Sequence, residues 1–108
     1  MFWTALKRGY LIIPLSERLL RGLGRIAYRK TRIARGDKTE THTHRLFSFY
    51  VTEKMKALQT PNGELELPDR ALVIVLPQVL HGWTNEKGET DRSFVYDLTP
   101  MHAPHVIR

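Results

Sequence analysis

Short apolar segments separated by turn signals recur along the 108-residue chain, and this rhythm limits the fold more than any other feature. The clearest turn is Pro61-Asn62-Gly63, because an Asn-Gly pair suits a tight hairpin that requires positive φ. The residues 64–67 that follow alternate strictly, as on a strand. About seven or eight short strands, with turns roughly every 8–12 residues and almost no helix, predict an all-β fold, a small antiparallel sandwich or barrel.

The predicted strands cover residues 10–15, 25–33, 40–58, 64–67, 71–76, 79–83 and 93–98, and the longest of them bends near residue 54. Ser16 is a suitable cap for a brief helical turn through Arg21, whereas Gly22 and Gly24 argue against a longer helix. The length fits a single domain. We expect residues 1–24 to form a basic and apolar extension that packs on a barrel of residues 25–108.

Positive charge is concentrated in the first third of the chain, although the net charge of the whole is only +6. Residues 1–38 carry ten Lys/Arg and two acids, hence +8, and the other 70 residues carry seven Lys/Arg and nine acids, hence −2. Such asymmetry marks surfaces for nucleic acid, anionic membranes or acidic ligands. Here the basic residues are spread singly among apolar ones, so we do not expect a nucleic-acid partner.

The chain has no cysteine, which excludes disulfides, cysteine-based zinc sites and a thiol nucleophile. No apolar stretch approaches the length of a membrane span, and the first residues lack the basic and then apolar pattern of a signal peptide. We therefore expect a soluble protein of the cytoplasm, without a membrane partner.

Three histidines are the strongest candidates for a functional site. His42 and His44 lie two positions apart on the longest predicted strand, so both side chains project from one face. His81 follows the next buried strand and is expected to meet them. Imidazoles in this number suit a divalent metal, of which Zn, Fe, Ni, Mn and Cu are the candidates. The alternative is that the three form a hydrogen-bonded polar lining inside the barrel. His102 and His105, in a proline-containing tail, are predicted to be surface residues.

Four further side chains are candidates for contact with a ligand, since binding pockets are mainly apolar with a few polar groups. They are Ser48, Tyr50, Trp83 and Tyr96. Tyr50 is favoured because it shares the predicted face of the histidines, whereas the aromatic residues are individually also good core residues. Glu40 shares that face as well and is a candidate carboxylate ligand, although its place at a strand end favours the surface.

The spacing of the histidines resembles the two sequence motifs of the cupin superfamily. The first cupin motif runs Gly, five residues, His, one residue and His, which is the arrangement of Gly36, His42 and His44. The second contains a proline turn, then His, three residues and Asn, which is the arrangement of Pro77, His81 and Asn85. The resemblance covers roughly residues 25–98. It implies a double-stranded β-helix, that is, a jelly-roll barrel, with the three histidines as metal ligands.

Two departures from the cupin pattern narrow the functional expectation. Ser48 or Phe49 stands where the family has a metal-binding glutamate, and Gln78 stands in the turn where the family has glycine. In this respect the chain is more similar to the sensor domains of AraC-type regulators than to oxygenase cupins. The helix-turn-helix half of such regulators has no counterpart in this sequence. The resemblance therefore implies ligand sensing or binding without direct DNA contact.

The first functional hypothesis is a small-molecule-binding or sensing cupin, with a divalent metal held by the three histidines. The second is a metal-dependent cupin enzyme such as a dioxygenase or an isomerase. A third, a protein that binds nucleic acid through its basic first 38 residues, is the least favoured. A homodimer that forms through an edge strand or the amino-terminal segment is also expected.

Overall fold

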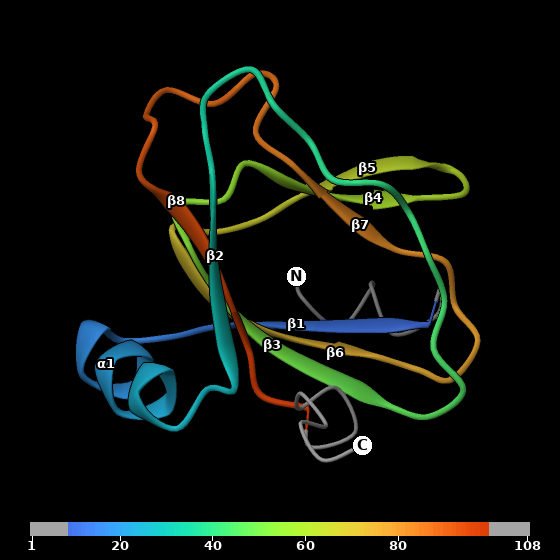
Figure 1. Cartoon of the computed structure of the whole chain (residues 1–108), viewed down its shortest axis with the longest axis horizontal. Helices are drawn as coiled ribbons and strands as arrows, with labels where there is room; N and C mark the ends of the chain where they lie inside the picture. The colour runs from blue at the N-terminus through green and yellow to red at the C-terminus, as the bar shows by residue number, and fades with distance from the viewer. Residues whose placement is uncertain (1–8, 100–108) are drawn as a thin grey trace, which may run out of the picture.

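The computed structural model describes residues 9–99, which form two antiparallel sheets and one helix (Figure 1). The larger sheet has the order β1-β6-β3-β8-β2 and the smaller one the order β5-β4-β7. The elements are β1 (Tyr10–Pro14), α1 (Glu17–Arg25), β2 (Arg29–Ile33), β3 (Ser48–Glu53), β4 (Ala57–Thr60), β5 (Gly63–Glu66), β6 (Arg70–Val75), β7 (Gly82–Thr84) and β8 (Ser93–Asp97). The predicted all-β fold is confirmed, and the described strands form two sheets rather than one closed barrel.

Next to the central strand β3 of the larger sheet lies β6, which pairs with β1 on one side and β3 on the other. Its alternate residues Ala71, Val73 and Val75 are buried, whereas Leu72 and Ile74 between them are only half-buried on the opposite face. The buried face joins Tyr10, Tyr50 and Trp83 in one core between the two sheets. The apolar run 71–76 is therefore a core strand, as predicted, because one whole face of it is removed from water.

The smaller sheet contains the predicted hairpin. Thr60 pairs with Gly63, so Pro61 and Asn62 form a two-residue turn. Gly63 has a φ of 119°, which a residue with a Cβ atom rarely adopts, and this explains the glycine. Leu58 of β4 is completely buried and anchors the hairpin on the core.

The helix α1 is longer than the sequence predicts. Ser16 is its N-cap, as expected, and its hydroxyl accepts a hydrogen bond of 3.2 Å from the backbone N–H of Leu19. The helix then continues through both glycines to Arg25. Its buried Leu20 docks it on the protein, and a Cβ atom on Gly24 would lie 3.2 Å from the Tyr96 ring. Gly24 thus permits close packing of α1 on the larger sheet, which outweighs its low helix propensity. No helix among residues 9–99 has the length and apolar character needed to cross a membrane.

The predicted strand 40–58 exists only in part. It begins at Ser48 as β3, ends at Glu53, turns at Lys54 with a φ of 54°, and resumes as β4. Residues 34–47 instead form an extended crossing segment that carries the chain from the outer strand β2 to the central strand β3 (Figure 1). This segment runs antiparallel to residues 78–85 and bonds to them at single bridges, not along a continuous strand.

Candidate metal centre

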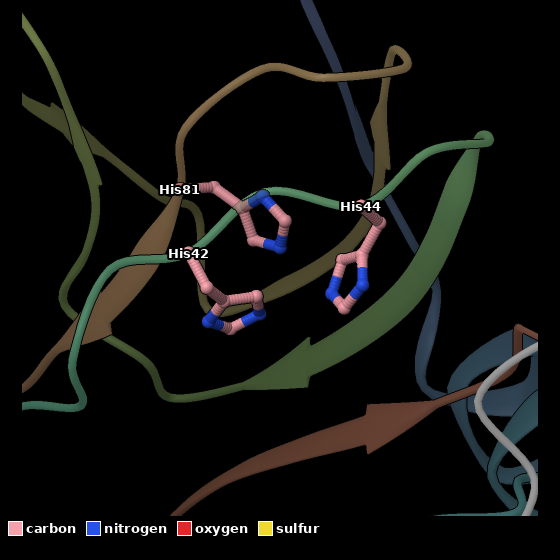
Figure 2. Close-up of side chains that lie close together, drawn as sticks. All are labelled: His42, His44 and His81. Atoms are coloured by element: carbon pink, nitrogen blue, oxygen red, sulfur yellow. The ribbon is translucent and has the colours of Figure 1, made fainter.

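His42 and His81 face each other across an isolated antiparallel bridge. The N–H of His42 donates to the carbonyl of His81 at 2.9 Å, and the N–H of His81 donates back to the carbonyl of His42 at 3.0 Å. Directly opposed residues of an antiparallel pair project to the same side, so both imidazoles enter the same space (Figure 2). The bridge therefore explains why residues distant in sequence meet.

His44 joins this pair from two residues further along the crossing segment. Its carbonyl accepts a hydrogen bond of 2.7 Å from the N–H of Gln78, which fixes this end of the segment. The ring centroid of His44 lies 4.6 Å from that of His42 and 5.3 Å from that of His81, and His42 and His81 are 4.5 Å apart. One nitrogen of each ring lies within 4.8 Å of the others. The predicted convergence of the three histidines is confirmed, although they lie on a crossing segment and a bridge instead of a long strand.

The three rings differ in exposure. His81 is fully buried, His44 is half-buried and His42 is exposed. Two neighbours hold the backbone beside His81: the Tyr10 hydroxyl donates to the carbonyl of Leu80, and Gly9 packs directly against Val79. The cluster thus combines one fixed imidazole, one that is partly enclosed and one that faces solvent.

The His81 ring makes a hydrogen bond at each nitrogen. Nδ1 lies 3.1 Å from the carbonyl oxygen of Val79, and Nε2 lies 3.2 Å from the hydroxyl oxygen of Tyr50. The Tyr50 side chain is itself almost fully buried, and its ring meets that of Trp83 edge to face at 5.1 Å. Burial raises the pKa of Tyr50 to about 12, so its hydroxyl keeps its proton near neutral pH.

His42 and His44 form one wall of a pocket of about 400 Å³, and His81 lies directly behind them. The inner face of the larger sheet forms another wall, and the remaining lining comes from the crossing segment and β7. The lining residues are Arg29, Thr31, Ile33, Thr39, His42, His44, Tyr50, Trp83, Val95 and Asp97. Tyr50, Asp97 and Arg29 lie in one row, since each is the register partner of the next across β3, β8 and β2. The pocket thus offers apolar surface, a carboxylate and a guanidinium beside the histidines.

Of the four predicted ligand contacts, Tyr50 and Trp83 line this pocket, and Ser48 and Tyr96 do not. Ser48 is buried at the start of β3. Tyr96 lies on the outer face of β8, where its hydroxyl donates to Glu53 at 3.0 Å and its ring packs against α1. The reason is the alternation of β8: Val95 and Asp97 face the pocket, so Tyr96 between them faces away.

Asn85 and Glu40 also have definite places. Asn85 of the second motif is fully buried, and its side-chain N–H₂ donates to the carbonyls of Ile33 at 3.0 Å and Thr90 at 2.9 Å. It therefore secures the neighbouring loops. Glu40 is exposed, and the metal-binding group found among residues 9–99 contains the three histidines without it. His102 and His105 lie outside the described residues.

Sequence reasoning missed four polar lining residues, Arg29, Thr31, Thr39 and Asp97. A signal for two of them was present, because Arg29 and Thr31 share one face of a predicted strand. The strand pairing that turns this face toward the histidines, β2 on β8 and β8 on β3, is not visible in the residues themselves.

The donor set fits a divalent transition metal. Imidazole nitrogens bind such ions at about 2.0–2.1 Å, so ligands at tetrahedral angles lie about 3.4 Å apart. The largest separation here, 4.8 Å, requires the rings to approach by about an ångström or more. Exposed His42 has the most room for this approach, and half-buried His44 has more than fully buried His81.

Comparison with protein-family models, with curated proteins and with solved structures finds no match for this chain. The likeness to cupins therefore stays an expectation from the two sequence motifs.

Proposed function

We propose that this protein binds a divalent metal ion through His42, His44 and His81 and, with it, a small anionic molecule in the adjoining pocket. The observation that carries the proposal is the meeting of three imidazole nitrogens, within 4.8 Å of one another, at the wall of a pocket. Unrelated packing seldom brings three histidines together around one point, and histidine is the commonest metal ligand in proteins.

The ligand's charge follows from the donor set. Three neutral imidazoles leave the charge of a divalent ion uncompensated, so the bound metal favours an anionic partner at its open positions. Arg29 at the far end of the pocket row offsets the negative charge of Asp97, and Ile33, Trp83 and Val95 supply apolar surface. A small organic acid with an apolar portion matches this lining, and the pocket volume of about 400 Å³ limits it to a small molecule.

In terms of class, we propose a binding or sensing protein of cupin type, similar to the sensor domains of AraC-type regulators. Support comes from the two motifs and from an all-β fold in which the motif histidines meet. The second candidate, a metal-dependent dioxygenase or isomerase, is favoured only by the nearness of titratable Tyr50 and Asp97 to the histidines. Oxygen consumption by the metal-loaded protein, with candidate thiols, diols or keto acids, distinguishes this enzyme from a binding protein.

The metal test compares wild type with His81→Ala and with a His102→Ala/His105→Ala double variant. Zn²⁺ and Co²⁺ are titrated by calorimetry into protein prepared without an affinity tag or chelator. We expect one metal per chain, a loss of at least 100-fold in affinity for His81→Ala, and no change for the double variant. Equal affinity of His81→Ala and wild type would overturn the proposed site, and circular dichroism of each variant confirms that it is folded.

The homodimer stays a prediction. Light scattering during size-exclusion chromatography, with and without Zn²⁺, measures the mass of the particle. A mass of twice 12.6 kDa would support the dimer, and a mass of 12.6 kDa under both conditions would contradict it.

A further inference from the structure

The Tyr50 hydroxyl is hydrogen-bonded to Nε2 of His81, which is also the nitrogen that a metal ion would need. Nδ1 of His81 lies beside the carbonyl oxygen of Val79, and a carbonyl oxygen only accepts hydrogen bonds. Nδ1 therefore carries the proton of the neutral ring, and Nε2 has the lone pair. The Tyr50 hydroxyl, 3.2 Å from Nε2, must then donate to it. Nε2 is also the nitrogen left to coordinate a metal, because Nδ1 is engaged by Val79.

We propose that Tyr50 couples metal binding to anion binding: its hydroxyl donates to His81 when no metal is bound, and to the metal's anionic ligand when one is. This inference rests on the three-histidine site proposed above. The lone pair of Nε2 can accept a hydrogen bond or coordinate a metal, but not both. A metal on Nε2 therefore breaks the hydrogen bond that the Tyr50 hydroxyl donates, and the hydroxyl keeps its proton.

The Tyr50 ring has little freedom to move away from His81. It is 4% exposed, it packs edge to face on Trp83, and β3, which carries it, lies between β6 and β8 in the middle of the larger sheet. Rotation of the O–H bond is the remaining movement. After displacement the hydroxyl therefore stays within a few ångströms of the metal, directed at the pocket that Tyr50 helps to line.

A buried hydroxyl that loses its acceptor is destabilised until it finds another. An anion bound to the metal at the pocket side presents that acceptor in the right place. Asp97, the register partner of Tyr50, and Ser48, whose side chain interacts with the Tyr50 hydroxyl, are competing partners. Oδ1 of Asp97 already receives the N–H of Thr99 at 2.9 Å. If Tyr50 turns to the anion, each ligand strengthens binding of the other by the same factor, as linkage requires.

The coupling predicts opposite effects of a single substitution. Tyr50→Phe removes the hydrogen bond that competes with the metal, so metal affinity without anion should rise about 3- to 10-fold. The same variant has no donor for the anion, so anion affinity of the metal-loaded protein should fall about 5- to 30-fold. A merely structural role of Tyr50 would weaken both affinities, and a role as metal ligand would weaken the first.

The experiment uses Co²⁺, whose visible absorption reports both events. Wild type, Tyr50→Phe and Tyr96→Phe are titrated with Co²⁺ in a non-coordinating buffer, and the Co²⁺-loaded proteins are then titrated with azide. Tyr96→Phe is the matched control, because it removes a hydrogen-bonded phenol hydroxyl from the outer face of the same sheet. We expect it to leave both constants unchanged. Thermal unfolding of the metal-free variants confirms that each is folded.

The outcomes separate the two proposals. Higher Co²⁺ affinity together with lower azide affinity in Tyr50→Phe supports the coupling. Normal Co²⁺ binding with unchanged azide affinity in Tyr50→Phe overturns the coupling and leaves the three-histidine site in place. Absence of Co²⁺ and Zn²⁺ binding by wild type overturns both.

Discussion

Gly82 packs against Glu40 so closely that a methyl group in its place would displace the neighbouring backbone. A Cβ atom on Gly82 would lie 3.2 Å from the carbonyl oxygen of Glu40 and 3.1 Å from Cγ2 of Thr41. Gly82 directly follows His81, and Glu40 and Thr41 directly precede His42. The separation of the two histidine-bearing segments therefore depends on this glycine.

Gly82→Ala should push the crossing segment away from β7. We expect the free energy of unfolding to fall by about 1–2 kcal/mol and Zn²⁺ affinity to fall about 10-fold. Gly22→Ala is the control, because nothing lies within 4 Å of an added Cβ in α1, and helix propensity should make it slightly stabilising. Urea unfolding and calorimetry measure the two effects. A Gly82→Ala protein with wild-type Zn²⁺ affinity would contradict the role of this close contact.

Asn85→Ala tests whether the second-motif asparagine is structural. The substitution removes the donor from the buried carbonyl of Ile33 and from the partly buried carbonyl of Thr90, so we expect a loss of about 2–4 kcal/mol in the free energy of unfolding. Exposed Asn62→Ala should cost less than about 1 kcal/mol. At temperatures where Asn85→Ala is folded, its Zn²⁺ affinity should stay within a few-fold of wild type. A total loss of binding by folded protein would instead place Asn85 at the metal.

Ionisation of Tyr50 should lower the free energy of unfolding at high pH. Its pKa is raised from an ordinary value of 10.0 to about 12 in the fold, chiefly by burial, so folding favours the neutral phenol. The resulting stability is fully present below pH 10 and is lost as pH rises toward 12, by about 1–3 kcal/mol. Tyr50→Phe should remove this component. Urea unfolding of both proteins between pH 8 and 11.5 measures it, and parallel pH curves for the two would contradict the shift.

Metal affinity should fall as the solution becomes acidic. Imidazole coordinates only when it is neutral, and an ordinary histidine takes up a proton near pH 6.5. Three ligands compete with protons together, so Zn²⁺ affinity should drop at least 10-fold between about pH 7 and pH 5.5. Calorimetry in buffers of different ionisation enthalpy also counts the protons released on binding. Affinity that is constant over this range would exclude histidine ligands.

Local patterns predicted the parts of the fold that depend on neighbouring residues. The hairpin at Pro61–Gly63, the N-cap at Ser16 and the core strand 71–76 were all confirmed, because turn chemistry, capping and apolar continuity are local. The helix α1 was underestimated, since contact of Gly24 with Tyr96 is tertiary and outweighs glycine's propensity. Residues 40–47 have strand-like alternation, but they cross between strands and lack a continuous partner.

For the candidate site, His42 and His44 were predicted from their spacing, since a spacing of two puts both on one side of any extended backbone. His81 was predicted from its place after the buried strand and from the second motif. The pocket wall was predicted less well. Tyr50 does line the pocket, whereas Tyr96 was assigned without knowing which face of its strand is buried. Arg29 and Asp97 were missed because they depend on the order of β3, β8 and β2.

The isolated bridge between His42 and His81 has a consequence for motion. A crossing segment that is held at single points opens more easily than a continuous strand, and its backbone amides should exchange with solvent sooner than those of β3 or β6. A metal joins His44 to His81 across 36 intervening residues and ties this segment to the buried interior. Opening would then require release of the ion, so the amide hydrogens of His42 and His81 would exchange more slowly as metal occupancy rises. The three histidines would thus hold the crossing segment reversibly against the interior of the protein.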